Sequence, residues 1–162
     1  MAGRILKILP APIQNFHRGA NCRTNAKHTK SKLTNQDKMT ILLCTTGDFL
    51  LTSLEYRFRK NGWQLEVAHD VKQAGQKTKE LLPGLIVVDL ELPEYEGLDI
   101  IQTLVKETMS QIPILVGAPL EKGSLLMEGL RLGATDFIIT PFKPDELVLR
   151  IRHILQMAKV AR

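Results

Sequence analysis

The sequence feature that most constrains the fold of this chain is a series of short, largely apolar runs separated by amphipathic stretches. The runs begin after Met39 and cover residues 41–44, 63–68, 85–88, 114–116 and 137–139. Runs of this length predict strands, and apolar residues at helical spacing between them predict helices. We therefore expect five strands alternating with five helices. A membrane-spanning helix is excluded, because no run reaches the roughly 18 apolar residues that it would need.

Cap and turn residues mark the ends of several expected helices. The first helix spans residues 48–61, and the second begins at Asp70, which can cap it, and runs to about Leu82. The fourth helix ends at Gly133 and the last one starts at Asp145. The apolar residues that should face the sheet are Leu51, Leu54 and Phe58 in the first helix, Leu98, Ile101 and Leu104 in the third, Leu126 and Leu130 in the fourth, and Leu147, Ile151, Ile154 and Leu155 in the last.

The central strands are apolar along their whole length instead of alternating between apolar and polar residues. Such strands favour a parallel sheet that helices cover on both faces, as in a doubly wound α/β domain. No long linker or internal repeat interrupts the series. We therefore expect one domain over residues 39–158, followed by a short C-terminal tail at 159–162.

Charge divides the chain in a different way. Residues 1–38 contain eight Lys or Arg and one Asp, whereas the rest holds 14 Lys or Arg and 16 Asp or Glu. The basic segment has too few apolar residues to offset its ordering entropy, so we predict that it is disordered. Three interpretations stay open: a passive or untranslated extension before Met39, an arm that binds nucleic acid or an anionic surface, or a targeting peptide.

The carboxyl ends of the expected strands are the places to look for chemistry, because an open parallel sheet binds ligands there. Asp89 directly follows the third apolar run. A carboxylate at such a position can act as a nucleophile, bind Mg²⁺ or simply cap the next loop. The cysteine, histidine and glycine residues of the chain give no comparable sign of a functional site. Cys22 and Cys44 are too few for a disulfide scaffold, the four histidines show no metal spacing, and no phosphate-binding glycine loop is present.

Three segments resemble the receiver domain of bacterial response regulators. They are VVDLELPEYEGLDII at 87–101, IPILVGAP at 112–119 and GLRLGATDFIITPFKPDELVLRIRHIL at 129–155. With the order of elements, the resemblance extends over residues 39–158. It implies a flavodoxin-like sheet with strand order 2-1-3-4-5. It also implies an aspartate that accepts a phosphoryl group from a histidine kinase or a small phosphodonor, assisted by Mg²⁺.

Part of the receiver site is retained under this resemblance. Asp89 matches the phosphoacceptor, and Glu91 takes the position whose backbone carbonyl binds the metal in the family. Pro93 matches the proline of the same loop. Phe137 matches the aromatic residue on the fifth strand that moves when the domain switches.

The remaining family positions have changed. Thr45 and Thr46 replace an acidic pair that holds Mg²⁺, Ala118 replaces a hydroxyl residue, and Thr140 replaces a lysine. Asp48 could partly replace the lost acids, although its place at the start of a helix favours a capping role. We expect weak Mg²⁺ binding, since that ion needs carboxylates. Phosphotransfer should be very slow, because removing even one stabilising group costs about 2.7–4 kcal/mol in a well-studied enzyme.

These observations favour a non-enzymatic, cytoplasmic, stand-alone pseudo-receiver in two-component signalling. It would act through contacts with a signalling protein or histidine kinase, and we expect no membrane partner. The expected surface is formed by the fourth helix, the fifth strand and the fifth helix, which could also support a homodimer. Its polar contacts would be Arg131, Asp136, Arg150 and Arg152, although these could equally be solvated surface residues.

Two alternatives remain open at this stage. In the first, Asp89 is a functional phosphoacceptor. In the second, the basic segment binds nucleic acid, which a strong dependence of affinity on salt would reveal. No helix-turn-helix pattern follows the receiver-like region, so we do not expect sequence-specific DNA recognition by this chain alone.

Overall fold

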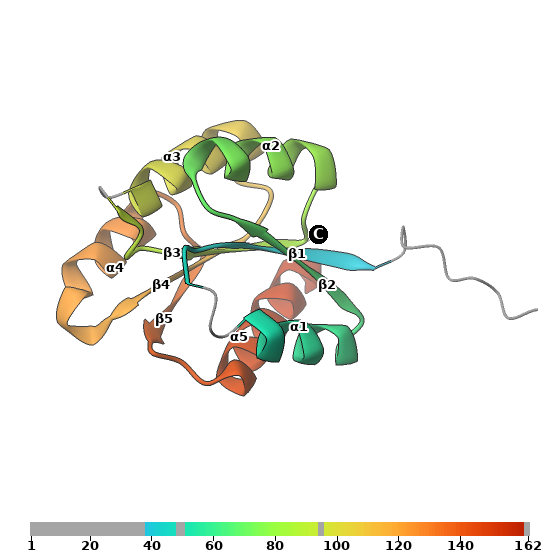
Figure 1. The fold of residues 1–162 in the computed structure, drawn as a ribbon. Coiled ribbons are helices and arrows are strands. Elements are labelled where there is room, and N and C mark those ends of the chain that lie inside the picture. Colours follow the sequence, from blue (N-terminus) through green and yellow to red (C-terminus); the bar gives the residue numbers. More distant parts are fainter. Residues whose placement is uncertain (1–37, 48–50, 94–95, 161–162) are drawn as a thin grey trace, which may run out of the picture. The chain divides into compact units, whose positions relative to one another are not determined.

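The computed structural model describes residues 38–47, 51–93 and 96–160 (Figure 1). Strands and helices alternate along the chain, as the sequence predicts. The strands are β1 (Met39–Cys44), β2 (Trp63–Ala68), β3 (Leu85–Asp89), β4 (Ile114–Pro119) and β5 (Asp136–Thr140). The helices are α1 (Leu51–Lys60), α2 (Val71–Leu81), α3 (Glu96–Thr108), α4 (Gly123–Arg131) and α5 (Pro144–Val160), with a 3-10 turn, η3 (Leu120–Lys122), before α4. Asp48 and nearly all of the basic segment at 1–38 lie outside the described residues.

The five strands form one sheet in the order β2-β1-β3-β4-β5, and every neighbouring pair is parallel. This confirms the flavodoxin-like topology. In the centre of the sheet, Leu43 of β1 is in register with Val67 of β2 on one side and Val87 of β3 on the other. The strand order changes direction between β1 and β3, so the carboxyl ends of these two strands form the crevice where such sheets bind ligands.

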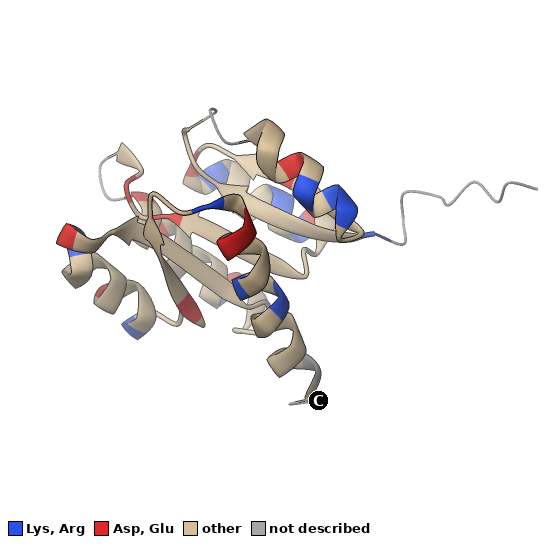
Figure 2. Cartoon of the chain, turned by 90° about the horizontal axis from the view of Figure 1, so that it is seen from below, with Lys and Arg blue, Asp and Glu red and all other residues tan. Residues whose placement is uncertain are grey.

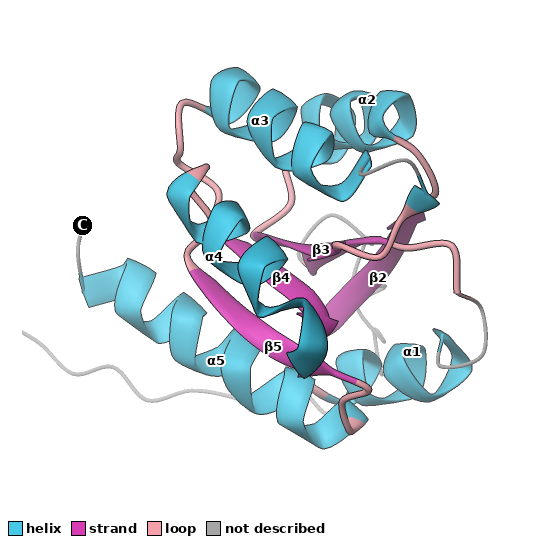
Figure 3. Ribbon diagram, turned by 90° about the vertical axis from the view of Figure 1, so that its left-hand side faces the viewer, coloured by secondary structure: helices cyan, strands magenta, loops and turns pink. Residues whose placement is uncertain are grey.

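Helices cover both faces of the sheet (Figure 3). Successive side chains of a strand point to opposite faces, and this divides the core into two clusters. Ile86 and Val88 of β3 pack with residues of α2, α3 and α4, whereas Leu85 and Val87 pack with residues of α1 and α5. Because both faces are buried, the central strands have no polar side to expose, which explains their continuous apolar runs.

The helix ends agree with the predicted cap signals in part. The side chain of Asp70 accepts a hydrogen bond from the backbone N–H of Gln73 at 2.7 Å, so Asp70 caps α2 as predicted. The helix α5 continues to Val160, and residues 161 and 162 lie outside the described residues. None of the helices within the described ranges combines the length and the apolar character that crossing a membrane requires.

Two apolar residues are more exposed than their patterns predict. Leu130 is only half-buried, because α4 turns Leu126 and Gly129 toward the sheet instead. A Cβ atom at Gly129 would lie 3.4 Å from side-chain atoms of Ile101 and Val116, so α4 packs closely at this point. Phe137 is also exposed, since it lies on the edge strand β5 and on the opposite side of that strand from buried Ile138.

Candidate functional site

The candidate site lies where β1 and β3 end side by side. Asp89 is the last residue of β3, and Thr45 directly follows β1. The Thr45 hydroxyl donates a hydrogen bond to Oδ2 of Asp89 at 3.2 Å. The backbone N–H of Glu91 donates to the other oxygen, Oδ1, at 2.9 Å. The two carboxylate oxygens of Asp89 are therefore held by two neutral donors.

Thr45 is itself fixed by the backbone around it. It is buried, and its hydroxyl oxygen accepts a hydrogen bond from the N–H of Gly47 at 3.1 Å. Its carbonyl oxygen lies 2.9 Å from Nδ1 of His69, and its N–H donates to the carbonyl of Ala68 at 3.0 Å. Thr46, by contrast, is exposed. Of the two threonines that replace the acidic pair, Thr45 is thus a structural part of the site. Its contacts with Gly47 and His69 were not evident from the sequence.

Burial dominates the electrostatics of Asp89. Removal of its carboxyl group from water raises the pKa of Asp89 above its ordinary value, and the negative charge of Glu91 acts in the same direction. The hydrogen bonds from Glu91 N–H and Thr45, together with the charge of Lys122, oppose this rise in pKa without cancelling it. Lys122 forms an ion pair with Glu91, with its Nζ atom 3.1 Å from Oε1. The positive charge beside this site therefore comes from η3, a position that the sequence comparison did not single out.

The other two substituted positions contribute no hydrogen bond to Asp89. Ala118 is fully buried and packs in the cluster on the α2, α3 and α4 face. Thr140 ends β5, in register with Pro119, and its hydroxyl oxygen is buried without a hydrogen-bond partner in the described part of the chain. Threonine at position 140 therefore supplies no positive charge where the resemblance expects a lysine.

A cavity of about 380 Å³ opens beside Asp89. Its walls come from β1, α1, β3, β4 and the loops after β4 and β5, and they are mostly apolar. The lining residues are Leu43, Thr45, Gly47, Leu51, Leu54, Val87, Val88, Asp89, Glu91, Gly117, Pro119, Leu120, Glu121, Thr140, Pro141 and Phe142. The structure thus brings together Asp89, Glu91, Thr45 and Thr140 as predicted, whereas Ala118 is not among the lining residues.

Gly97 positions the aspartate, and the sequence analysis did not single it out. A Cβ atom at Gly97 would lie 2.8 Å from both the carbonyl oxygen of Asp89 and the Cα atom of Leu90. Both are backbone atoms, which have little freedom to move away. Glycine at this position therefore allows the first turn of α3 to pack directly against the backbone that carries Asp89.

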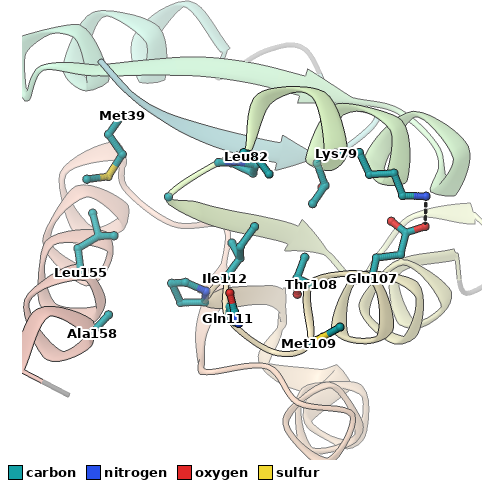
Figure 4. A pocket seen from close by; sticks show the side chains of 14 residues that line it. Met39, Lys79, Leu82, Glu107, Thr108, Met109, Gln111, Ile112, Leu155 and Ala158 are labelled. Atoms are coloured by element: carbon teal, nitrogen blue, oxygen red, sulfur yellow. Dashed lines mark ion pairs between the residues drawn. The ribbon is translucent and has the colours of Figure 1, made fainter. Parts of the chain in front are cut away.

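A second cavity, of about 600 Å³, lies at the opposite end of the sheet (Figure 4). Met39, Gly84 and Pro113, which begin or immediately precede β1, β3 and β4, are among its lining residues. Lys79 and Glu107 form an ion pair at one side of it, with 2.8 Å between Nζ and Oε1. Parallel α/β sheets bind ligands at the carboxyl ends of their strands, so the smaller cavity beside Asp89 is the better candidate site.

The described residues at Asp89 supply few of the donors that Mg²⁺ prefers. Within the described ranges, no group of three or more His, Cys, Asp or Glu residues is arranged to hold a metal. Mg²⁺ prefers an octahedral set of oxygens that includes carboxylates and phosphate. In contact with Thr45 there is one carboxylate, that of Asp89, whereas the carboxylate of Glu91 is paired with Lys122. Buried Cys44 is no alternative ligand, since burial raises the pKa of its thiol to about 12.

The predicted interface residues do not all contact one another. Arg150 lies on α5 next to β5: its guanidinium is 3.2 Å from Oδ2 of Asp136 and 5.9 Å from the ring centre of Phe137. Arg131 forms an ion pair with Glu128 within α4. Arg152, however, hydrogen-bonds Asn61 in the turn after α1, because α5 also packs against α1. The structure thus places Arg152 apart from Asp136 and Arg150.

The fold and the site define a doubly wound α/β domain with an aspartate at its topological switch point. The model of the response regulator receiver domain matches residues 33–152. This chain therefore belongs to the response regulator receiver domain family, which confirms the resemblance.

Curated relatives agree with this assignment. The chain is 30% identical over 121 residues to the alkaline phosphatase synthesis transcriptional regulatory protein PhoP of Bacillus subtilis, covering 75% of this chain and 50% of that protein. It is 31% identical to the response regulator MprA of Mycobacterium avium, covering 75% of this chain and 53% of that protein. The chain thus spans about half the length of these relatives.

Solved structures give the same fold. The receiver domain of the Francisella response regulator 1452 shares 26% sequence identity with a TM-score of 0.64, covering 77% of this chain and 100% of that one. A CheY-like receiver domain protein from Methanospirillum hungatei has a TM-score of 0.70 at 19% identity, covering 77% and 99% of the two chains. At that identity the second likeness shows the shared fold alone.

Proposed function

We propose that this domain is a pseudo-receiver, which signals in a two-component pathway through protein contacts while phosphorylation of Asp89 is impaired or absent. One observation carries the proposal: the groups that hydrogen-bond to Asp89 are neutral, whereas phosphotransfer needs positive charge. Its carboxylate is held by the hydroxyl of Thr45 and the N–H of Glu91. The residue at the end of β5 is Thr140, which has no charge.

The chemistry of phosphoryl transfer explains why this matters. The transferred group carries several negative charges, so catalysis depends on cations placed around it. Receiver domains commonly bind Mg²⁺ at this place, and here we expect only weak binding because one carboxylate remains. Lys122 is a cation near the site, but it is paired with Glu91. We further propose that the domain is not an enzyme.

The phosphodonor test decides between this proposal and a functional phosphoacceptor. Wild type and Asp89→Asn are incubated with acetyl phosphate and Mg²⁺, and the intact mass is measured. We expect no added phosphoryl group on either protein. A phosphoryl adduct on wild type that is absent from Asp89→Asn would contradict the proposal.

A restored variant supplies the positive control. Thr45→Asp, Thr46→Asp, Ala118→Thr and Thr140→Lys together return every changed position to the residue type that the resemblance implies. We expect this variant to gain an adduct on Asp89 under the same conditions. If it did so while wild type did not, the neutral neighbours of Asp89 would be the cause of the impairment.

We propose that the partner-binding surface is the face formed by α4, β5 and α5. Apolar side chains are exposed there: Met127 on α4, Phe137 on β5 and Leu149 on α5. Beside them is the ion pair between Arg150 and Asp136. The partner would be a histidine kinase, another signalling protein or a second copy of this domain.

Analytical ultracentrifugation tests the homodimer. If this face joins two copies, Leu149→Glu should shift the sedimentation of the protein from dimer to monomer. Tyr56→Glu on α1 is a matched control, since Tyr56 is similarly exposed but lies outside this face. A wild-type monomer at all concentrations would contradict the homodimer and leave a different protein as the partner.

Nucleic-acid binding is a less favoured alternative. Some relatives are named transcriptional regulatory proteins, such as PhoP of Bacillus subtilis, but the chain matches only about half of that protein. In the described part, positive and negative residues are interspersed over several elements (Figure 2). Salt-dependent binding to DNA that disappears when residues 1–38 are deleted would support this alternative.

A further inference from the structure

We propose that the cavity beside Asp89 binds a small organic molecule with an apolar body and a cationic nitrogen, and that this ligand supplies the regulatory input of the domain. The proposal rests on the pseudo-receiver function, because the ligand would act at the place where phosphorylation acts in other receivers. Four features of the cavity support it: its size, its apolar walls, the sign of its charged groups and its connection to α4 and α5.

The cavity has the size and the lining of a small-molecule site. Its volume of about 380 Å³ lies within the roughly 300–1,000 Å³ that is typical of such sites. Most of its walls are aliphatic, aromatic or proline side chains. These come from β1 (Leu43), α1 (Leu51 and Leu54), β3 (Val87) and the loops after β4 and β5 (Leu120, Pro141 and Phe142). A molecule with an apolar body would bury its surface against them.

Two small residues contribute to this space. Gly117 lines the cavity, and a Cβ atom built on it would point toward Thr140 and Ile138, 3.4 Å from Cγ2 of Thr140. This is an ordinary van der Waals distance, so a Cβ atom is tolerated at position 117, and we expect a larger side chain there to take up space in the cavity. Thr140 is also shorter than the lysine that the resemblance implies. Both residues leave room where longer side chains would fill the site.

The charged groups of the cavity favour a cation. Asp89, Glu91 and Glu121 line it, and the lining residues within the described ranges include no Lys or Arg. Lys122 neutralises Glu91 from outside the lining, which leaves Asp89, beside the apolar walls, and the exposed Glu121 as the other acids of the described lining. An ionised carboxylate accepts about four hydrogen bonds, and Asp89 receives two within the described part. A protonated nitrogen of the ligand would donate hydrogen bonds to the remaining acceptor positions of the Asp89 carboxylate.

An organic cation fits this site better than a metal ion does. The acids of the cavity do not form a group that could hold a metal within the described ranges. An ammonium group needs only one carboxylate and a few hydrogen-bond acceptors, and it brings its own apolar body to the walls. The combination of a half-buried carboxylate, Asp89, with a large apolar volume therefore favours an amine.

The walls of the cavity also connect it to the proposed partner surface. Leu120 and Glu121 lie in η3, which leads directly into α4, and Pro141 and Phe142 lie between β5 and α5. A ligand that fills the cavity contacts both connections. Its binding can therefore shift the positions of α4 and α5 without any phosphoryl group.

Three probes of similar shape test the proposal. The full chain, labelled with ¹⁵N, is titrated with 2-phenylethylamine, 2-phenylethanol and 3-phenylpropanoate, which place an ammonium, a hydroxyl and a carboxylate on the same ring system. We expect the amine to shift the amide signals of Leu120 and Phe142 and to bind about tenfold more tightly than the alcohol or better. The carboxylate should not bind.

Variants assign the binding to the cavity. Gly117→Val should abolish binding of the amine because its side chain fills the space, and Asp89→Asn should reduce the affinity for the amine to that for the alcohol. Gly123→Ala is the control for a glycine substitution, since a Cβ atom there has no neighbour within 4 Å. Its affinity for the amine should equal that of wild type. The ¹⁵N spectrum of each variant confirms that it is folded before the titration.

The outcomes separate the two proposals. Equal affinity for all three probes, or binding that persists in folded Gly117→Val, would overturn the ligand proposal, as would the absence of any shift. The mass measurement with acetyl phosphate is made on the same protein. A phosphoryl adduct on Asp89 would contradict the pseudo-receiver function whatever the titration shows, whereas failed binding without an adduct contradicts only the ligand proposal.

Discussion

At the scale of single residues, the site is organised around one half-buried carboxylate, that of Asp89, whose hydrogen-bond donors are neutral. Asp89 ends a strand whose preceding residues are fully apolar, so its side chain stands at the border of the core. Thr45 and the N–H of Glu91 donate hydrogen bonds to it, but neither brings a charge. Burial of an ion without a paired charge is unfavourable, and this is the reason that the pKa of Asp89 is raised.

The raised pKa predicts how stability responds to pH. The folded protein binds the Asp89 proton more tightly than the unfolded chain, whose pKa is near 3.8. The free energy of unfolding therefore falls as pH rises from 3.8 through the folded pKa. Asp89→Asn cannot ionise, so we expect it to be more stable than wild type at pH 7, with the difference shrinking as pH falls through the folded pKa of Asp89 toward 3.8.

Urea unfolding of both proteins at several pH values measures this difference. If Asp89→Asn were less stable than wild type at pH 7, the hydrogen bonds of the carboxylate would outweigh its burial. A difference that did not change with pH would show that Asp89 is not the titrating group.

Thr45 gives a second prediction at this scale. Thr45→Val keeps the shape of the side chain but removes the hydroxyl that joins Asp89 Oδ2 to the N–H of Gly47. Leaving buried polar groups unpaired costs about 1–3 kcal/mol, so we expect a loss of that size in chemical denaturation. The neighbouring Thr46→Val is the matched control, because Thr46 is exposed and should change stability by less than about 0.5 kcal/mol. Equal effects of the two substitutions would contradict this role of Thr45.

At the scale of secondary-structure elements, the packing of α3 against the end of β3 places Asp89. The contact depends on Gly97, because a Cβ atom there would lie 2.8 Å from two backbone atoms of residues 89 and 90. The sequence contains this glycine within the segment that resembles receivers, but only the packing of the two elements shows its steric role. A helix cap or an apolar period can be recognised in the local sequence. The close approach of a residue to the backbone of another segment leaves no such local pattern.

Gly97→Ala tests this contact. We expect a loss of about 1–3 kcal/mol in the free energy of unfolding, since the new methyl group forces the backbone of α3 away from β3. The amide signals of Asp89 and Leu90 should shift as well. Gly123→Ala, in a helical conformation with open space around it, should instead stabilise the protein by about 0.4–1 kcal/mol. If Gly97→Ala left the free energy of unfolding unchanged, the packing of α3 against the end of β3 would not depend on this glycine.

At the scale of the whole domain, one sheet joins two apolar clusters. Each central strand contributes alternate residues to both faces, so neither cluster exists without the other. This arrangement predicts a single cooperative unfolding transition for the described domain.

Ile86→Ala and Trp63 fluorescence test that cooperativity. Ile86 is fully buried on the α2, α3 and α4 face, whereas Trp63, the one Trp of the sequence, packs on the α1 and α5 face. We expect Ile86→Ala to lower the free energy of unfolding by about 2–5 kcal/mol, with coincident transitions by Trp fluorescence and far-UV circular dichroism. Leu82→Ala, at an exposed position, is the control. Separate transitions by the two probes would contradict a single cooperative unit.

The sequence alone determined the order of elements, the parallel sheet and the residues at its carboxyl end. Apolar runs without alternation require two covered faces, and a parallel sheet gathers its strand ends at one edge, so Asp89, Thr45 and Thr140 were expected together. Only the tertiary structure decided what surrounds these residues. It places the hydrogen bond between Thr45 and Asp89, the positive charge of Lys122 beside Glu91, the close packing at Gly97 and the cavity lined by Gly117. These depend on distances between residues far apart in the chain, which no local spacing encodes.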